Sequence, residues 1–200
     1  MELIEIEHGG LRRRAWLHAP PAATGAVPLV VMLHGAGGTA ALAAANTRWP
    51  ELAAREGFAL VLPEGTVRDP ARPPQFRLNP QAWNDGSGRG HAARRGVDDV
   101  GLIAALIDDI GRRVPLLPDG VMIAGFSNGA GLAFRAGAEL ASRVTAIGAV
   151  GGHCWIERPA PARPVSLMYL MGAHDPLNPL AGGEVRTPWG RTEHHPAVRQ

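Results

Sequence analysis

The stretch Val121-Met122-Ile123-Ala124-Gly125-Phe126-Ser127-Asn128-Gly129 is the segment on which the fold prediction rests. Residues 121–124 are apolar and predict a buried strand, whereas residues 128–140 predict a helix. Ser127 therefore lies at a strand-to-helix turn, with a glycine two positions away on either side. Such a turn strains the serine backbone, and glycines flank it because a Cβ there would collide with the strand or the helix. The turn presents the serine hydroxyl above the sheet as a nucleophile. The alternative is a glycine-rich connection whose serine has no chemical role.

Strand and helix patterns alternate on both sides of this turn. Predicted strands cover residues 3–7, 11–18, 28–33, 58–62, 121–124, 145–150 and 165–171, and predicted helices cover residues 49–56, 98–114 and 128–140. The first two strands read as a hairpin, and Asp98 and Asp99 are expected to cap the second helix. Residues 63–96 lack periodicity, which is typical of a functional loop. The whole pattern predicts one α/β domain, a mostly parallel sheet with helices on both faces.

Acyl transfer also needs N–H donors for the developing oxyanion. The backbone N–H of Asn128, directly after the serine, is one predicted donor. The other is expected in His34-Gly35-Ala36-Gly37-Gly38, which follows the predicted strand 28–33, and Ala36 is the residue of choice. His34 could itself act in catalysis, but at this position we expect it to brace the loop through hydrogen bonds.

Composition excludes several other classes of protein. The formal net charge is +2, and all 20 basic residues are arginine, so no nucleic-acid partner is expected. Within Arg12-Arg13-Arg14 the pleat of a strand sends Arg13 to the face opposite its neighbours. Cys154 is the only cysteine, which rules out an internal disulfide. No signal-peptide pattern and no membrane-length apolar run occurs in this chain, so the sequence as written predicts a soluble, cytoplasmic protein without a membrane partner, although related enzymes are often exported.

The motifs together resemble the esterase family that includes poly(3-hydroxybutyrate) depolymerases and feruloyl or acetylxylan esterases. The matching stretches occur in the family's order, at residues 33–38, 83–85, 97–101, 125–130 and 172–176. The resemblance implies an α/β-hydrolase fold and a serine esterase that forms an acyl-serine intermediate on Ser127, without metal or organic cofactor. It also implies a small-molecule or polymeric ester substrate.

Two further residues take candidate roles from this resemblance. Asp175 is implied as the acid of the catalytic triad, and the chain order serine, acid, histidine agrees with that role; the alternative is a simple Asp-Pro turn. Trp83 is implied as an aromatic near the acyl or alcohol pocket, and it could equally anchor its loop.

The chain departs from the family pattern after Asp175. The family's catalytic histidine lies beyond the acid, after another helix and strand, but this sequence ends 25 residues after Asp175. We therefore expect a single hydrolase domain over residues 1–200 that is incomplete at its C-terminus and lacks the last helix, the last strand and the usual histidine. His194 and His195 are expected in an exposed polar tail. His153 and His174 lie nearer the expected site, but neither occupies the family's position for the base.

Three functions remain open from the sequence. The leading hypothesis is a carboxylic-ester hydrolase acting on polyester, hydroxycinnamoyl-sugar or short-chain esters. The second is a catalytically impaired hydrolase-fold module that binds an ester or acyl ligand, and the third is a serine peptidase of the same fold. No histidine spacing suggests a metal site, and the sequence leaves the oligomeric state open.

Overall fold

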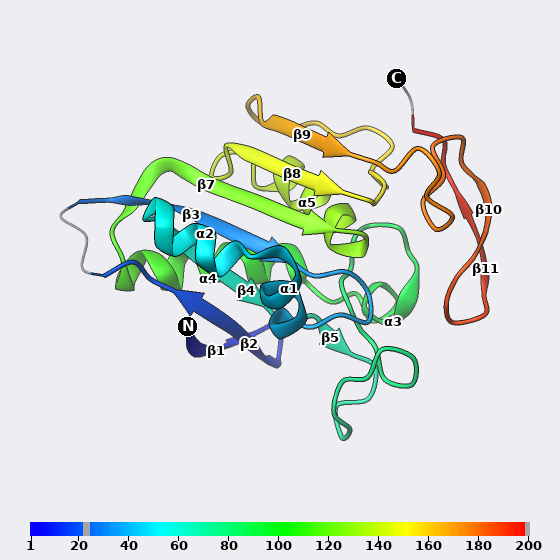
Figure 1. Ribbon diagram of the computed structural model, residues 1–200, viewed down its shortest axis with the longest axis horizontal. Coiled ribbons are helices and arrows are strands. Elements are labelled where there is room, and N and C mark those ends of the chain that lie inside the picture. Colours follow the sequence, from blue (N-terminus) through cyan, green and yellow to red (C-terminus); the bar gives the residue numbers. More distant parts are fainter. Residues whose placement is uncertain (22–24, 199–200) are drawn as a thin grey trace.

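One twisted sheet of seven strands forms the centre of the computed structural model, which describes residues 1–21 and 25–198 (Figure 1). In spatial order the strands are β1 (Glu2–His8), β2 (Leu11–His18), β4 (Ala59–Pro63), β3 (Val27–Leu33), β7 (Leu116–Phe126), β8 (Ala146–Val150) and β9 (Ser166–Leu170). The pairs β1–β2 and β2–β4 are antiparallel and the other four pairs are parallel. The predicted hairpin and the mostly parallel sheet are thus confirmed.

Helices lie on both sides of this sheet (Figure 1). On one side the helix α1 (Ala40–Thr47) contacts β3 and β4, and α2 (Trp49–Glu56) contacts β2 and β4. The helices α4 (Asp99–Arg113) and α5 (Asn128–Glu139) pack on the other side. The predicted helix 49–56 is α2. The helix α1 was not predicted from the sequence, because its alanines favour helix but give no amphipathic spacing.

The core follows from the alternation of side chains along the central strands. Leu29, Val31 and Leu33 of β3 join the cluster beneath α4 and α5, whereas Val30 and Met32 join the one beneath α1 and α2. A strand buried on both faces needs an uninterrupted apolar run, as residues 28–33 provide. Each fully buried side chain of this size contributes roughly 1.5–3 kcal/mol relative to an exposed one.

The sheet is covered unevenly. Val30, which faces α1 and α2, is in register with Met122 of β7, so the same face continues across β8 and β9. On that face Met122 is 38% exposed, Val150 40%, Met168 62% and Leu170 54%. The expectation of helices on both faces therefore holds at β3 and β4, while in the described part of the chain no helix covers this face of β7–β9.

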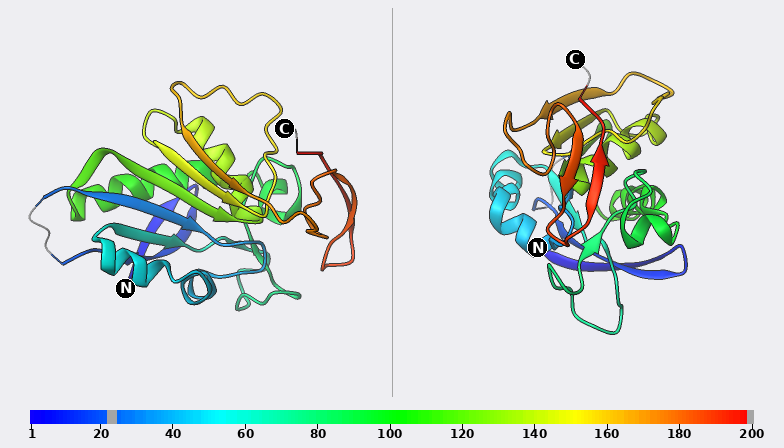
Figure 2. Two further views of the ribbon diagram at one scale, coloured as in Figure 1. Left: turned by 45° about the horizontal axis from the view of Figure 1, so that its top comes forward. Right: turned by 90° about the vertical axis from the view of Figure 1, so that its right-hand side faces the viewer.

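The carboxyl ends of the parallel strands meet at one edge of the molecule. Four short elements gather there, namely β5 (Thr66–Val67), β6 (Gln81–Ala82), α3 (Gly90–Arg94) and the hairpin of β10 (Gly183–Arg186) and β11 (Thr192–His195) (Figures 1 and 2). The first three lie within the segment 63–96 that was predicted as a loop. The expected polar tail after Asp175 instead folds as the hairpin, with Val185 and His195 buried.

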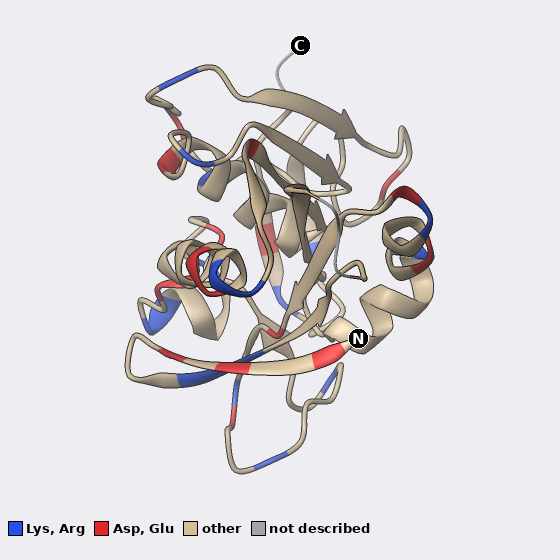
Figure 3. Cartoon of the chain, turned by 90° about the vertical axis from the view of Figure 1, so that its left-hand side faces the viewer, with Lys and Arg blue, Asp and Glu red and all other residues tan. Residues whose placement is uncertain are grey.

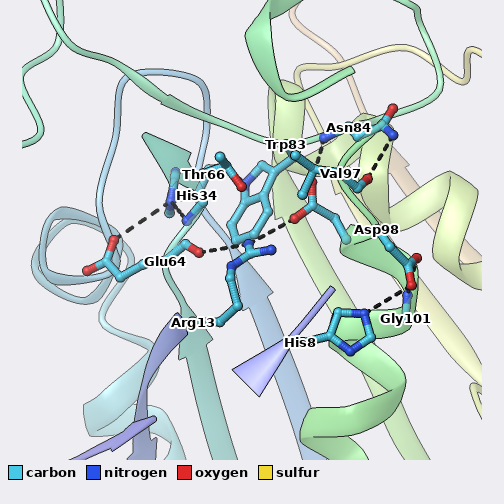
Figure 4. A network of polar contacts seen from close by, with 12 residues as sticks. His8, Arg13, His34, Glu64, Thr66, Trp83, Asn84, Val97, Asp98 and Gly101 are labelled. Carbon is cyan, nitrogen blue, oxygen red and sulfur yellow. Dashed lines mark hydrogen bonds and ion pairs between the residues drawn. The ribbon is translucent and has the colours of Figure 1, made fainter. Parts of the chain in front are cut away.

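Asp98 caps α4, accepting the Gly101 N–H at 2.9 Å, as expected. The expectation that Asp99 is also a cap is wrong. The Asp99 side chain is fully buried and accepts hydrogen bonds from Arg13 at 2.9 Å and from the Asn84 N–H at 2.7 Å. Figure 4 shows the Arg13 guanidinium pointing toward the loop that carries Trp83 and Asn84. This buried ion pair joins β2, α4 and that loop, because a charge without water must find a partner.

The predicted pleat of the arginine run is confirmed, since Arg12 and Arg14 are exposed and pair with Glu5 while Arg13 is buried. Over the rest of the chain, acidic and basic positions are interspersed rather than separated by sign (Figure 3). Within residues 1–21 and 25–198, no helix combines the length and apolar character that crossing a bilayer requires.

Replacing Arg13 by Met should lower the free energy of unfolding by about 3 kcal/mol, because the Asp99 carboxylate is left buried without its counter-charge. Arg12→Met is the matched control, because it removes an exposed ion pair on the same strand, and should cost less than about 0.5 kcal/mol. Urea-induced unfolding followed by tryptophan fluorescence measures both. Equal losses would show that the buried pair has no special role.

Candidate active site

Ser127 occupies a strained backbone conformation between β7 and α5, with φ 54° and ψ −118°. Residues other than glycine rarely adopt positive φ, and holding one there costs on the order of 1–3 kcal/mol. The surrounding chain enforces it, as the Ser127 N–H donates to the Val150 carbonyl at 2.8 Å. The predicted strand–turn–helix around Ser127 is confirmed.

Glycines around Ser127 are required by close backbone contacts. A Cβ on Gly125 would lie 2.1 Å from the Gly129 carbonyl oxygen, and one on Gly129 would lie 2.4 Å from the Leu33 carbonyl oxygen. A third close approach, not predicted from the sequence, occurs at Gly152 after β8, where a Cβ would lie 2.2 Å from the Ser127 carbonyl oxygen. Three glycines thus let β7, α5 and the β8 loop converge on the serine.

The glycine-rich loop after β3 lies directly against this turn. A Cβ on Gly35 would be 3.2 Å from the Ser127 Cβ, so the loop and the serine are in contact. Ala36 and Asn128 both line the cavity beside Ser127. Within the described residues the Ala36 N–H has no recorded hydrogen-bond partner, and the Asn128 N–H lies in the first turn of α5, where helices leave donors free. This geometry agrees with the predicted oxyanion hole, and those two roles stay predictions.

His34 braces the loop, as predicted. Its ring is buried, and its Nε2 accepts the Gly65 N–H at 3.0 Å. The proton must therefore be on Nδ1, which donates to the Gly35 carbonyl at 2.8 Å. Burial lowers the pKa of His34, although the hydrogen bond to the Gly35 carbonyl and the charge of Glu64 each act to raise it. A neutral imidazole engaged at both nitrogens holds the loop and is not available as a base.

Trp83 has the contacts of a loop anchor. Its side chain is only 1% exposed, although it forms part of the cavity wall, and its indole N–H donates to the His34 carbonyl at 2.8 Å. Its ring also lies 4.9 Å from the His34 ring, centroid to centroid (Figure 4). That Trp83 also contacts substrate stays a prediction.

The Asn128 side chain joins the nucleophile turn to the loop of Trp83. Its Oδ1 accepts the Trp83 N–H at 2.7 Å, and its Nδ2 donates to the buried Asp85 carboxylate at 2.7 Å and to the Trp83 carbonyl at 3.2 Å. From the sequence, Asn128 was expected to act only through its backbone N–H. Its side-chain role depends on partners more than 40 residues away in the chain, which no local pattern reveals.

Asp175 follows β9 and lines the same cavity as Ser127. Its Oδ1 accepts the N–H groups of Leu177 and Asn178, at 2.8 and 2.9 Å. Its Oδ2 lies 3.8 Å from the position of a Cβ on Gly151, at the end of β8. One carboxylate oxygen is thus anchored in a turn, and the other faces the loop beside Ser127. The Asp-Pro turn and the triad acid are compatible in this arrangement.

The expectation that His195 lies in an exposed tail is wrong, because its side chain is buried and lines the cavity together with Ser127, Asp175 and His153. The rings of His153 and His195 lie 5.2 Å apart, and Trp155 contacts both. His194 and His174 are exposed. Because β11 is an extended strand, its successive side chains point to opposite sides, so His194 faces solvent and His195 is buried.

Charge and burial keep both cavity histidines neutral. Burial, and then the positive charge of Arg89, lowers the pKa of His195 to about 4. Its Nε2 lies 2.7 Å from an Arg89 nitrogen, and since arginine can only donate, this Nε2 is the acceptor. Burial and Arg89 also lower the pKa of His153, while Asp175 opposes them. In the described residues the buried His153 Nε2 has no hydrogen-bond partner.

The cavity measures about 350 Å³ and lies at the carboxyl edge of the parallel strands, where open α/β sheets form their sites. In the part of the chain that the structure describes, no group of three or more His, Cys, Asp or Glu side chains is arranged to hold a metal ion.

Comparison with solved structures identifies the class of fold. The crystal structure of native pOPH shares 15% identity, with a TM-score of 0.66 over 98% of this chain and 72% of that chain. An acetyl xylan esterase from Aspergillus awamori also shares 15% identity, with a TM-score of 0.59 over 79% of this chain and 56% of that one. At such identity the likeness shows the fold alone, which is the α/β-hydrolase fold predicted from the sequence.

The family follows from sequence comparison. The family profile described as Esterase PHB depolymerase matches residues 14–185, and the chain belongs to that family. NocK, a proposed esterase of Nocardia uniformis subsp. tsuyamanensis, is 28% identical over 187 residues, which cover 89% of this chain and 49% of NocK. The chain therefore spans about half the length of this relative. The family resemblance stated from the sequence motifs is confirmed.

Gly125→Ala should destabilise the protein by at least about 2 kcal/mol, because the added Cβ collides with main chain that cannot move aside. Gly148→Ala on the adjacent strand β8 is the matched control, since a Cβ there meets no atom within 4 Å, and it should change stability by less than about 0.5 kcal/mol. Urea unfolding of both variants tests this requirement. A Gly125→Ala variant as stable as the control would contradict the close contact at the turn.

Proposed function

We propose that this chain acts as a carboxylic-ester hydrolase that forms an acyl intermediate on Ser127. The observation that carries the proposal is the positive φ of Ser127, in a turn so closely packed that positions 125, 129 and 152 have no room for a Cβ. Strain of this kind persists where the surroundings hold it, and it is found preferentially at functional sites. Family membership supports an ester as the substrate.

The proposed chemistry uses groups around the cavity. The Ser127 Oγ attacks the ester carbonyl carbon while a base takes its proton, and the resulting oxyanion accepts hydrogen bonds from the Ala36 and Asn128 N–H groups. Collapse of this intermediate expels the alcohol, which receives the proton, and leaves an acyl-serine. Water then attacks the acyl group by the same route and releases the acid. Asp175 would orient the histidine base through its Oδ2.

His153 and His195 are the two histidines of the cavity, and they differ in how well each could act as the general base for Ser127. The lone pair on His195 Nε2 is occupied by Arg89, and a pKa of about 4 makes His195 a weak base at neutral pH. His153 has an unpartnered Nε2 in the described residues. The role therefore falls to His153 or to a histidine contributed from elsewhere.

A second candidate function is an ester-binding or acyl-binding module without turnover. It is favoured by one observation: among residues 1–21 and 25–198, no hydrogen bond is recorded between the Ser127 hydroxyl and an imidazole. Without a base a serine hydroxyl is little ionised at neutral pH and is a poor nucleophile.

The cavity wall supports an ester with an apolar or aromatic part. Phe76, Phe126, Trp155, Leu177 and Trp189 all line it. Aromatic walls bind flat or extended apolar groups through large contact area, so polyester, hydroxycinnamoyl and short-chain esters are all compatible with it.

A fluorescent fluorophosphonate should label the wild-type chain and fail to label Ser127→Ala, because only an activated serine displaces fluoride. Ser142→Ala, which removes an exposed serine beyond α5, is the matched control and should label like wild type. Hydrolysis of p-nitrophenyl butyrate should fall by on the order of 10⁴-fold or more in Ser127→Ala.

The same assay separates the two candidate functions and assigns the base. A binding module without turnover would show no labelling of the wild type at all. If labelling occurs, loss in His153→Gln but not in His195→Gln assigns the base to His153. Retained labelling in both would place the base elsewhere.

A further inference from the structure

The rim of the cavity carries three arginines from three different segments. Arg68 follows β5, Arg94 ends α3, and Arg191 immediately precedes β11. All three are exposed and all line the cavity that contains Ser127. Within the described residues, none of the three forms a recorded ion pair with a carboxylate.

The acidic groups of the same cavity are already engaged. Glu193 pairs with Arg89 at 2.7 Å. Asp85 accepts hydrogen bonds from Asn128 and Ser87, and Asp175 accepts two backbone N–H groups. None of these three carboxylates forms an ion pair with Arg68, Arg94 or Arg191 in the described part of the chain.

Arg89, the fourth arginine of the cavity, differs from these three. Besides Glu193, it lies 3.9 Å from the Asp85 carboxylate, and its guanidinium carbon is 3.8 Å from the centroid of the Trp155 ring. The Arg89 side chain is thus held in place by several partners, whereas Arg68, Arg94 and Arg191 form no ion pair within the described residues.

Two of the rim charges converge on one buried group. The ring of His91 is buried in α3 and its Nε2 lies 2.7 Å from the Thr66 carbonyl oxygen. Burial lowers the pKa of His91, and the positive charges of Arg95, Arg68 and Arg94 lower it further. His91 is consequently neutral at pH 7. The charges of Arg68 and Arg94 both act on this one ring, and both residues line the cavity beside it.

The third charge is held over the same cavity by an aromatic contact. Trp189 in the turn between β10 and β11 donates its indole N–H to the Phe76 carbonyl at 2.9 Å, and the two rings lie 5.5 Å apart. Arg191 is two residues beyond Trp189, so this contact fixes its segment against the loop that follows Arg68.

We propose that the ester acted on here carries a carboxylate, which Arg68, Arg94 and Arg191 bind at the rim while the aromatic wall holds the remainder over Ser127. This inference rests on the proposed ester hydrolysis and adds the substrate class. A guanidinium presents its N–H donors in a planar fork that matches a carboxylate. Unpaired cations at the mouth of a cleft also attract an anionic substrate from solution.

The test compares mono-p-nitrophenyl glutarate with p-nitrophenyl valerate, which has a similar length and no charge. In the triple variant Arg68→Gln, Arg94→Gln, Arg191→Gln, the ratio of kcat/KM for the glutarate to that for the valerate should fall about tenfold, since an exposed pair contributes little singly and three act together. Raising the NaCl concentration from about 0.05 to about 0.5 M should narrow the wild-type ratio.

The matched control is the triple variant Arg12→Gln, Arg55→Gln, Arg112→Gln, which removes the same charge at exposed positions outside the cavity lining. It should keep the wild-type ratio. An equal ratio in wild type and in the rim variant would overturn the proposal.

A binding measurement separates failure of this proposal from failure of ester hydrolysis. Quenching of tryptophan fluorescence gives the dissociation constants of cinnamate and of the neutral cinnamamide, and no turnover is required. Wild type should bind cinnamate about tenfold more tightly, and the rim variant should lose that preference. If neither ester is hydrolysed, the proposed ester hydrolysis is wrong. The preference for cinnamate over cinnamamide then still tests whether the rim arginines bind a carboxylate. Equal binding of both ligands by wild type would overturn that role.

Discussion

The site depends on one steric constraint, the convergence of four backbone segments around Ser127. The strand β7, the helix α5, the end of β3 and the loop after β8 approach so closely that a Cβ at 125, 129 or 152 would overlap main-chain atoms. This crowding keeps Ser127 at positive φ. The N-terminal end of α5 faces the cavity, which is lined by Asn128, the first residue of that helix. A helix N-terminus carries partial positive charge and free N–H groups, which suits a developing oxyanion.

Hydrogen bonds from distant segments hold the loops around this turn. Asn128 fixes the loop of Trp83 and Asp85, His34 fixes the glycine-rich loop against Gly65, and the buried pair of Arg13 and Asp99 fixes Asn84. Arg13, His34, Asp85 and Asp99 are buried, and each would be costly without its partner. The loops are therefore positioned by the core of the domain, which makes the cavity a pre-formed feature of the fold.

Much of the fold was predictable because it depends on local periodicity. The apolar run of β3, the amphipathic spacing of α4 and the glycine pattern around Ser127 each identify their element from neighbouring residues alone. The alanine-rich α1 was not predicted, since its residues have high helix propensity but no periodic spacing of apolar and polar side chains. Asp99 and His195 were misjudged for a different reason: Arg13 lies 86 residues from Asp99, and Arg89 lies 106 residues from His195, so only the folded chain brings them together.

The most direct test of the account is a crystal structure of the chain after reaction with diisopropyl fluorophosphate. The account predicts a phosphoryl group bonded to the Ser127 Oγ, with its oxygen accepting hydrogen bonds from the backbone N–H groups of Ala36 and Asn128 at about 2.7–3.1 Å. An unmodified Ser127, or an adduct whose phosphoryl oxygen points away from both N–H groups, would contradict it.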